Sequence, residues 1–576
     1  MKKTAGSLFL MLFMALSVNA QGTIFDMSEY GVKPGAKNNT AKFARALDKI
    51  RASGKAEGAT LVFSPGRYDF FPDGSTVRSY HVANHGLFEG SVGLCLEGLD
   101  GVTIDGRGAD FVFHGLMMPV SLLHSSDCTL KDFTIDFDDM GLIQSKVISM
   151  SRSEGTVLEL LPGQKSYVDD DNVLCTDAGW GHPVIPCFVS VVDGRTRRIA
   201  YNTGDQGFPN QDIEKLPDNR IRIRHWYNEK IKEGNYLIMR GVERPSPGIF
   251  MDDDKDTRVE DVKVYYTHGM GLQAQISENV TLDRFDVCLR DSSRYVSALC
   301  DATHFTQCSG LISACNGRYE CMGDDAINVD GICLQIVQKP AANMVRMKFM
   351  HAQTQDIEWG RPGDKVEFIR RSTSLPVSAG TIKSIRPDGA GFVLVTLEED
   401  LPEFIVEEKF CAENISRTPG MVFNDNWVGR NRARGALVTT RGKVLMEGNT
   451  FDHVAGTAIL FSGDCNYWYE SGPCKDVTIR NNTFINNLTS PYEYCEAVIS
   501  IDPVIFDLDA QDGYYNDTIS ITGNRFYNFG APIIFAKSVR NLIFKDNEIR
   551  TNDEFEPIGS WSGQFRLKRV GFFDAD

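Results

Sequence analysis

The chain has 576 residues, of which 42% are hydrophobic and 24% charged, and its formal net charge is −17. This length exceeds that of one compact core, so we expect several domains or a repeat architecture. An acidic surface repels nucleic acids and polyanionic glycans at long range. The charge therefore argues against both as partners and favours a neutral substrate.

Residues 1–20 have the pattern of a signal peptide. Lys2 and Lys3 form a charged start, residues 7–18 an apolar stretch, and VNA at 18–20 a small-residue cleavage site. The apolar stretch is too short to span a bilayer, and no later segment reaches the necessary length. We therefore expect an exported protein, located in the periplasm, on the surface or outside a Gram-negative-type bacterium, with no membrane span.

Residues 21–138 are interpreted as an N-terminal cap followed by the first coils of a solenoid. Asn39-Thr40 precedes AKFARALDKI, in which four apolar residues follow helical spacing: Phe43, Ala46, Leu47 and Ile50. A solenoid needs such a cap, because its end coil otherwise exposes an apolar interior and an unpaired strand edge.

An eight-residue pattern recurs four times in residues 413–576, which are interpreted as C-terminal β-helix repeats. It consists of alternating apolar residues, then Asn and a closing Phe or Ile, in VLMEGNTF, VTIRNNTF, ISITGNRF and LIFKDNEI. These segments start at 444, 477, 519 and 542, and looser copies start at Val102, Cys128 and Val280. Short strands repeating at a base interval of about 23 residues, lengthened by loops, predict an all-β chain wound as a parallel β-helix.

The asparagines of this pattern are Asn449, Asn482, Asn524 and Asn547. In one interpretation their side chains stack inside the solenoid as a ladder of amides that bond to one another. In the other, each asparagine simply tolerates a left-handed turn. Both interpretations place the residues at a corner of the coil.

Residues 139–240 and 336–412 lack the asparagine pattern and alternate in the manner of antiparallel strands, with a turn at Pro387-Asp388-Gly389. We interpret both as inserted β-barrel or β-sandwich domains. The intervening residues 241–335 then form central coils of the β-helix.

Fourteen cysteines are present, but their spacing is not that of a small disulfide-stapled scaffold. Cys128 and Cys288 fall in or beside strand-like segments, where a free thiol behaves as a buried apolar group. Cys465 and Cys474 flank a turn-rich loop and are the best candidates for a disulfide.

Three carboxylates are the candidate catalytic groups. Asp301 precedes the pair Asp324 and Asp325 by 23 residues, about one coil, so the three side chains should meet on neighbouring parallel strands. Like charges held that close raise at least one pKa, which lets an acid and a base coexist as glycoside hydrolysis requires. A solvated turn and a calcium site are the alternatives for these residues.

Four further residues are candidates for substrate binding. His304 is placed to orient a sugar hydroxyl, although a structural role is as plausible. Arg290 and Arg294 precede the site, where they would bind hydroxyls or lower a carboxylate pKa, with ordinary surface arginine as the alternative. Trp427 is a candidate platform for the apolar face of galactose, with ordinary packing as the alternative.

The segments SALCDATHF (297–305) and YECMGDDAINVDG (319–331) resemble those of glycoside hydrolase family 110, and the similarity extends through nearly all of the mature chain. These bacterial α-1,3-galactosidases remove terminal galactose from blood-group B type glycans. The resemblance implies a right-handed parallel β-helix with inserted β-barrels and hydrolysis with inversion. The three-aspartate plan also resembles polygalacturonases, but their Gly-His-Gly and Arg-Ile-Lys motifs are missing, which argues against pectin.

The expected enzyme is an exo-acting α-1,3-galactosidase that needs no metal or organic cofactor. Asp324, its pKa raised by its neighbours, would protonate the leaving oxygen, and Asp301 and Asp325 would hold and deprotonate water. Inversion needs carboxyl groups about 6.5–9.5 Å apart, so the side chains would have to diverge at a bend. The rival functions are a β-helical polysaccharide lyase, a polygalacturonase-like hydrolase and a non-catalytic glycan-binding solenoid. The oligomeric state and the acceptor, fucosylated or linear, stay open.

Overall fold

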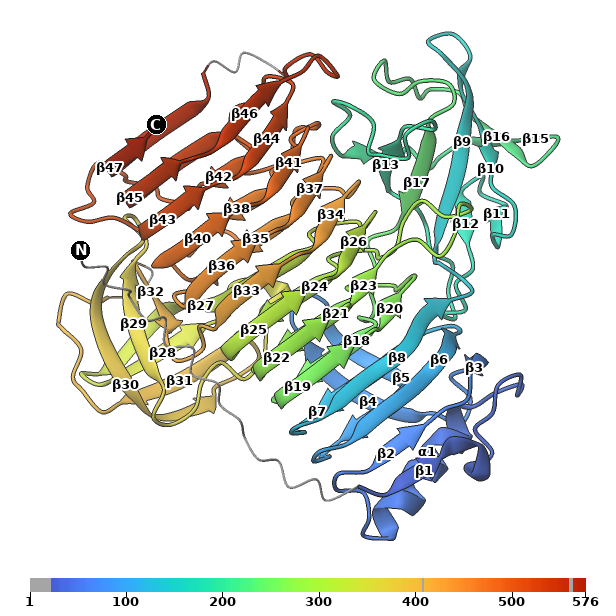
Figure 1. Cartoon of the computed structure of the whole chain (residues 1–576), viewed down its shortest axis with the longest axis horizontal. Coiled ribbons are helices and arrows are strands. Elements are labelled where there is room, and N and C mark those ends of the chain that lie inside the picture. Colours follow the sequence, from blue (N-terminus) through green and yellow to red (C-terminus); the bar gives the residue numbers. More distant parts are fainter. Residues whose placement is uncertain (1–21, 407–408, 559–562) are drawn as a thin grey trace, which may run out of the picture.

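A computed structural model describes residues 22–406, 409–558 and 563–576, so the predicted signal peptide at 1–20 lies outside the described residues. The chain forms a parallel β-helix with three sheet faces (Figure 1). The first face contains β7 (Met117–Leu123), β18 (Ile249–Asp252), β21 (Leu272–Gln275), β24 (Thr303–Thr306), β27 (Ile327–Ala341), β35 (Ala436–Val438), β38 (Ile459–Phe461), β42 (Ile499–Ile501) and β45 (Ile534–Lys545). All of these neighbours pair in parallel, which confirms the predicted fold class.

The other two faces repeat the same order from coil to coil. The second contains β8 (Thr129–Phe137), β19 (Lys255–Glu260), β22 (Glu278–Asp283), β25 (Ser309–Cys315), β33 (Gly420–Asn424), β36 (Lys443–Glu447), β40 (Asp476–Arg480) and β43 (Asn516–Thr522). The third contains β20 (Lys263–Val264), β23 (Asp286–Val287), β26 (Arg318–Glu320), β34 (Trp427–Gly429), β37 (Thr450–Asp452), β41 (Thr483–Ile485), β44 (Arg525–Asn528) and β46 (Glu548–Thr551).

Aromatic side chains stack along the interior of the C-terminal coils. Phe484 lies between Phe451 and Phe526, with ring centroids 5.2 and 4.7 Å apart and nearly parallel planes. Residues at the same position of consecutive coils therefore pack directly on one another, as the repeat predicts. Such stacked pairs stabilise the core by about 0.5–1.5 kcal/mol each beyond their burial.

The amide ladder is present at the corner between the second and third faces. Side-chain nitrogen Nδ2 of Asn449 donates to Oδ1 of Asn482, Asn482 to Asn524, and Asn524 to Asn547, at 2.9–3.0 Å. The ladder starts one coil earlier than predicted, because Asn426 donates to Asn449 at 3.1 Å.

The alternative interpretation of these asparagines, that they adopt a left-handed turn, is wrong. The positive φ angles belong to the residues just before them, at Gly448 (71°), Asn481 (57°), Gly523 (66°) and Asp546 (55°). The residue that makes the left-handed turn therefore comes directly before the asparagine that forms the ladder hydrogen bonds.

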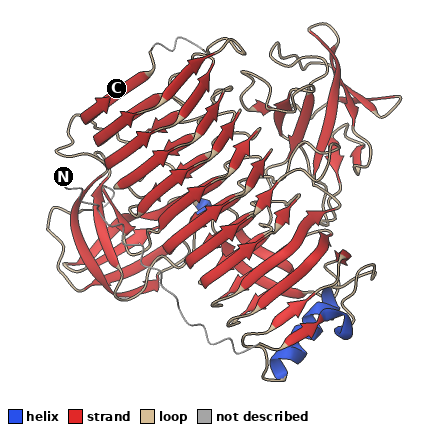
Figure 2. Cartoon of the chain, in the orientation of Figure 1, coloured by secondary structure: helices blue, strands red, loops and turns tan. Residues whose placement is uncertain are grey.

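Helix α1 (Thr40–Ala52) covers the N-terminal end of the solenoid, as predicted, and is the helix drawn at that end in Figure 2. The four apolar residues expected to face the core are all buried: Phe43, Ala46, Leu47 and Ile50. Phe43 stacks on Phe63 with centroids 6.2 Å apart, so the helix joins the same core as the coils.

Two antiparallel domains lie on opposite sides of the coil stack in Figure 1. The first is a seven-stranded sheet of β9 (Leu142–Ser151), β10 (Gly155–Leu160), β13 (Phe188–Val192), β14 (Gln206–Gly207), β15 (Ile213–Leu216), β16 (Arg220–Ile223) and β17 (Tyr236–Arg240). The second is a closed barrel formed by the later part of β27 with β28 (Met344–Lys348), β29 (Lys365–Arg370), β30 (Leu375–Pro387), β31 (Phe392–Leu397) and β32 (Phe410–Asn414). The predicted turn at 387–389 joins β30 to β31.

Each of the fourteen cysteines is a free thiol. Cys128 and Cys288 are buried, as predicted. The predicted Cys465–Cys474 disulfide is wrong, because Cys465 packs against Cys333 and Cys411 of the barrel strands, whereas the Cys474 thiol donates to the Val438 carbonyl. In the described part of the chain, no helix has both the length and the apolar character that crossing a membrane requires.

Candidate active site

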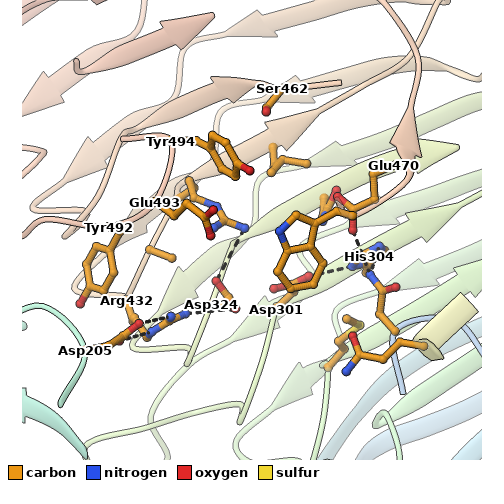
Figure 3. A pocket seen from close by; sticks show the side chains of 18 of the residues that line it. Asp205, Asp301, His304, Asp324, Arg432, Ser462, Glu470, Tyr492, Glu493 and Tyr494 are labelled. Atoms are coloured by element: carbon orange, nitrogen blue, oxygen red, sulfur yellow. Dashed lines mark hydrogen bonds and ion pairs between the residues drawn. The ribbon is translucent and has the colours of Figure 1, made fainter. Parts of the chain in front are cut away.

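A cavity of about 590 Å³ opens on the outer side of the first face (Figure 3). Its floor comes from the corners that precede β24, β27 and β35, and its walls from the loop after β38, the loop before β42 and the first inserted domain. The volume is in the range of small-molecule sites. Its polar lining includes Asn84, Asp205, Arg244, Asp301, His304, Asp324, Arg432, Arg434, Asp464, Glu470, Tyr492 and Tyr494.

The structure brings the three candidate carboxylates together. Thr303 pairs with Ile327, so Asp301 and Asp325 occupy equivalent positions two residues before consecutive strands of the first face. The backbone N–H of Asp325 donates to Oδ1 of Asp301 at 3.1 Å, and one oxygen from each of Asp301, Asp324 and Asp325 lies within 4.8 Å of the others. Winding of the chain thus places three acidic groups in one cluster at the cavity.

Access to the cavity differs within this cluster. Asp324 exposes 27% of its side chain, Asp301 exposes 7%, and Asp325 exposes none. Asp301 and Asp324 line the cavity directly. A proton exchanged with a bound molecule therefore passes most readily through Asp324.

Two arginines from the next coil neutralise the carboxylates. Arg434 lies two residues before β35 and contacts Asp325 through Nε at 2.9 Å, while its backbone N–H donates to Oδ1 at 3.1 Å. Nη1 of Arg432 lies 3.1 Å from Oδ2 of Asp324, and Nε of the same side chain donates to Asp205 at 2.7 Å. These guanidinium groups give Asp324 and Asp325 each a cationic partner, so oxygens of both carboxylates are already engaged.

The predicted rise in the pKa of Asp324 is wrong. Burial raises the pKa of Asp324, but the positive charges of Arg432 and Arg434 outweigh burial, and the net pKa is lowered. The raised carboxyl is its neighbour: burial, with the charges of Asp324 and Asp301, holds the pKa of Asp325 well above the ordinary value, against the opposing effect of Arg434. Adjacent groups coupled this closely titrate as a unit.

His304 lies between two carboxylates beneath the cavity. Its Nδ1 contacts Oδ2 of Asp301 at 2.8 Å, and its Nε2 lies 3.5 Å from Oδ1 of Asp330. Burial lowers the pKa of His304, but the contacts with Asp301 and Asp330 outweigh burial and raise it well above 6.5. The imidazolium form of His304 is therefore favoured, and its positive charge lies beside the carboxylate cluster.

Glu470 of β39 (Glu470–Ser471) is a further acidic residue that lines the cavity. Burial and the charge of Asp330 raise the pKa of Glu470 to about 8, so at neutral pH its carboxyl group is mostly protonated. Nδ2 of Asn84 donates to Oε1 of Glu470 at 3.5 Å and lies beside the ring of His304, so the amide separates the glutamate from the histidine. Glu470 can therefore donate a hydrogen bond to a bound molecule.

The oxygens of the three aspartates are closer together than expected for an inverting site. The nearest oxygen of each lies within 4.8 Å of the others, whereas inversion uses carboxyl groups about 6.5–9.5 Å apart to leave room for an attacking water. The hydrogen bond from the Asp325 backbone N–H to Asp301 holds the two corners together. The stereochemical outcome is therefore not fixed by this spacing.

Three of the predicted binding residues lie elsewhere. Arg290 and Arg294 both pair with Asp136 of β8, and Trp427 on the third face lies 3.9 Å beneath the guanidinium of Arg318. None of the three lines the cavity. The loop after Cys288 turns back to earlier coils, and Trp427 belongs to a face that points away, so we assign none of them to substrate binding.

The sequence interpretation missed the residues that neutralise or extend the cluster, above all Arg432, Arg434 and Glu470. Arg434 stands one coil after Asp325, but 109 residues separate them because the barrel interrupts that coil. Extending the coil alignment across the predicted insertion at 336–412 was the signal available for RNRAR at 430–434. No comparable signal marked Glu470, which lies on the short strand β39 outside the repeating coil strands.

Both inserted domains match known family models. Residues 143–237 match the family model "GLAA-B beta-barrel domain I" and residues 344–408 match "GLAA-B beta-barrel domain II". Among solved structures, a Family 28 exopolygalacturonase of Yersinia enterocolitica aligns with a TM-score of 0.37 and 11% identity, over 96% of this chain and 78% of its own.

Similarity to curated proteins extends over nearly the whole chain. An α-1,3-galactosidase B of Phocaeicola vulgatus is 40% identical over 99% of both chains, and one of Bacteroides fragilis is 42% identical over 97% of this chain and 98% of its own. An α-1,3-galactosidase A of Bacteroides fragilis is 29% identical over 94% of this chain and 90% of its own. The chain therefore belongs to the family of these bacterial α-1,3-galactosidases.

Proposed function

We propose that this chain is an exo-acting glycoside hydrolase that removes terminal α-1,3-linked galactose from oligosaccharides and glycoconjugates. The observation that carries the proposal is the cluster of Asp301, Asp324 and Asp325 at the floor of the cavity. Paired acidic groups beside a sugar-sized cavity supply the acid and base that glycoside hydrolysis needs. The family relatives, named as α-1,3-galactosidases, support the choice of sugar and linkage.

Asp324 is the proposed general acid, because it is the most exposed of the three carboxyl groups. Because the pKa of Asp325 is raised, the coupled pair Asp324–Asp325 holds a proton. Asp324 would pass this proton to the glycosidic oxygen. The C–O bond to the leaving sugar then breaks with that proton on the leaving oxygen. Glu470, with a pKa of about 8, is the alternative acid.

Asp301 is the proposed base for the attacking water. Asp301 lines the cavity, and its contact with His304 holds the carboxyl group in place. The water would lie beside Asp301 and lose its proton to it as the water oxygen bonds to the anomeric carbon. This single displacement gives inversion, the outcome that the family resemblance implies.

Retention is the second candidate outcome, because the nearest oxygens of the three carboxyl groups lie within 4.8 Å of one another and a double displacement uses a closer pair than a single displacement. Incubating the enzyme with Gal-α-1,3-Gal and recording proton NMR spectra from the first minute distinguishes the outcomes. Inversion releases β-galactose first and retention releases α-galactose. An unsaturated product, or no release of galactose, contradicts the proposed function.

We propose further that the natural acceptor is a blood-group B type glycan and that the protein is exported. The acceptor rests on the family resemblance, and export rests on the signal-like pattern of residues 1–20. Side-by-side assays of fucosylated branched and linear galactosides test the first. Fractionation of the producing cells, with detection of mature protein starting at Gln21, tests the second.

A further inference from the structure

Three exposed aromatic residues lie on two loops, one of which lines the cavity. Trp468 lines the cavity and is 38% exposed, its chain neighbour Tyr467 is 61% exposed, and Phe506 is 58% exposed. The rings of Tyr467 and Phe506 meet edge to face with centroids 5.6 Å apart. We name these three residues the aromatic ledge. Grouped exposed aromatic rings of this kind mark binding surfaces more often than chance placement.

The loop of Tyr467 and Trp468 is held in one conformation. The carboxylate of Asp464 accepts hydrogen bonds from the backbone N–H groups of Asn466, Tyr467 and Trp468 at 2.7–2.9 Å. The indole of Trp468 is also supported on its protein side by the ring of His351, 4.9 Å away. A rigid loop of this type presents its rings without a large loss of conformational entropy on binding.

The second loop of the ledge is tied to the same cavity wall. Backbone N–H groups of Asp502 and Val504 donate to the carbonyls of Phe461 and Gly463, and the Ser462 hydroxyl donates to the Asp502 carbonyl. Ser462 itself lines the cavity (Figure 3). The loop with Phe506 therefore continues the wall outward from the cavity onto the next coil.

We infer that the aromatic ledge is the acceptor-side carbohydrate subsite, which binds sugars on the reducing side of the scissile bond. Flat aromatic rings bind the apolar C–H faces of pyranose rings, and the ledge begins at a residue shared with the cavity. The substrate class is then an extended oligosaccharide chain rather than an isolated digalactoside. This inference rests on the proposed hydrolysis of terminal galactose.

The test compares two substrates cleaved at the same bond: Gal-α-1,3-Gal and a linear pentasaccharide that ends in Gal-α-1,3-Gal. The measured quantity is the ratio of kcat/KM for the pentasaccharide to kcat/KM for the disaccharide. In the wild type this ratio should exceed one clearly. In the double variant Tyr467→Ala/Phe506→Ala it should fall about tenfold, mainly through the KM of the pentasaccharide.

Two further variants test whether the effect comes from a flat ring and from this position. Phe506→Leu keeps an apolar side chain but removes the flat ring, so it should lose most of the same advantage. Phe572→Ala removes a phenylalanine that is 54% exposed on β47 (Phe565–Ala575) and serves as the matched control, with the wild-type ratio expected.

Each outcome decides a different point. A wild-type enzyme that does not cleave the disaccharide contradicts the proposed function itself. An active wild type with no preference for the longer chain, or with the same ratio in the double variant, overturns the acceptor subsite. If the double variant instead changes the sedimentation coefficient while the ratio stays constant, the ledge is a contact between protein copies and the inference is wrong.

Discussion

Two corners of the same solenoid stack polar side chains at intervals of one coil, with opposite consequences. At the ladder corner, Asn449, Asn482 and Asn524 each donate from one amide atom and accept at another, so identical residues satisfy one another. At the catalytic corner, Asp301 and Asp325 occupy equivalent positions, but ionised carboxylates only accept hydrogen bonds. Stacked asparagines therefore stabilise the ladder corner, whereas stacked aspartates repel one another at the catalytic corner.

The catalytic corner is tolerated because cations reach it from elsewhere in the fold. Arg434 arrives from the next coil, Arg432 bridges to Asp205 of the first inserted domain, and His304 lies between Asp301 and Asp330. The ladder needs only its own asparagines, whereas the carboxylate cluster depends on unlike partners, of which Arg432 and Arg434 are distant in sequence. Substitutions that remove one partner at each corner measure this difference.

The largest effect is expected at the carboxyl group with the best access to the cavity. Asp324→Asn removes the proposed acid, and kcat should fall by about 10²–10⁴-fold because general acid catalysis contributes about that factor. Initial rates on Gal-α-1,3-Gal measure it, with thermal unfolding as the check on folding. Glu470→Gln is the matched comparison: a larger loss in this variant than in Asp324→Asn would transfer the acid role to Glu470.

The next largest effect is expected on stability, from the buried ion pair. Arg434→Met takes one of its two arginine partners from the coupled pair Asp324–Asp325, and the free energy of unfolding should fall by about 3–5 kcal/mol. Urea denaturation measures the change. Adding Asp325→Asn should recover most of it, since Asp324 then keeps Arg432 as its own cation.

Arg480→Met supplies the control for this ion pair. Arg480 pairs with Glu447 at 2.8 Å on the outside of the coils, where removal of one partner should change the free energy of unfolding by about 0–1 kcal/mol. Equal losses in Arg480→Met and Arg434→Met would contradict the view that the catalytic corner depends on its cations.

A smaller effect is expected in the ladder. Asn482→Ala leaves buried polar partners unsatisfied above and below it, and should cost about 1–3 kcal/mol of unfolding free energy without changing kcat. Asn547→Ala, at the part-buried end of the ladder, should cost less because water replaces the lost contact. Equal costs at both positions, measured by urea denaturation, would argue against a cooperative ladder.

The smallest effect is a displacement of the pH profile. The pKa of His304 is raised in the folded protein, so its contribution to stability is fully present below about pH 6.5 and is lost as pH rises through the folded value. Asp330→Asn removes one of the two carboxylates that raise this pKa, so the loss should begin at lower pH. The alkaline decline of kcat/KM and of the denaturation midpoint should both move in that direction.

Asp476→Asn is the matched control for the pH experiment, because Asp476 is exposed and pairs with Lys443 on the surface. Its profile should coincide with that of the wild type. Coincident profiles for Asp330→Asn and wild type would show that His304 does not require Asp330 to stay protonated.

Local pattern was enough for the features that repeat along the chain. The spacing of the asparagine motif predicted the β-helix and three of the four steps of the ladder, and alternating segments predicted both inserted domains. Asp301 and Asp325 were found in the same way, since a coil of nearly constant length converts a sequence interval into a contact. Helical spacing sufficed for α1.

The local sequence pattern did not predict which carboxyl groups of the site are protonated. The expected acid, Asp324, has a lowered pKa, because Arg432 and Arg434 lie beside it after a 77-residue insertion whose docking no local pattern describes. The disulfide prediction for Cys465 and Cys474 was wrong for a similar reason, since the Cys465 thiol faces the barrel. Flanking a loop in sequence says nothing about which way two side chains point.

The amino-acid sequence by itself determined the repeat, the coil length and therefore which carboxylates would meet. Only the tertiary structure decided their charge states, because a pKa depends on burial and on ions within a few ångströms, and here those ions come from three separate parts of the chain. The exposure of Asp324 relative to Asp325 was decided in the same way, by loops and inserted domains that close around the coil.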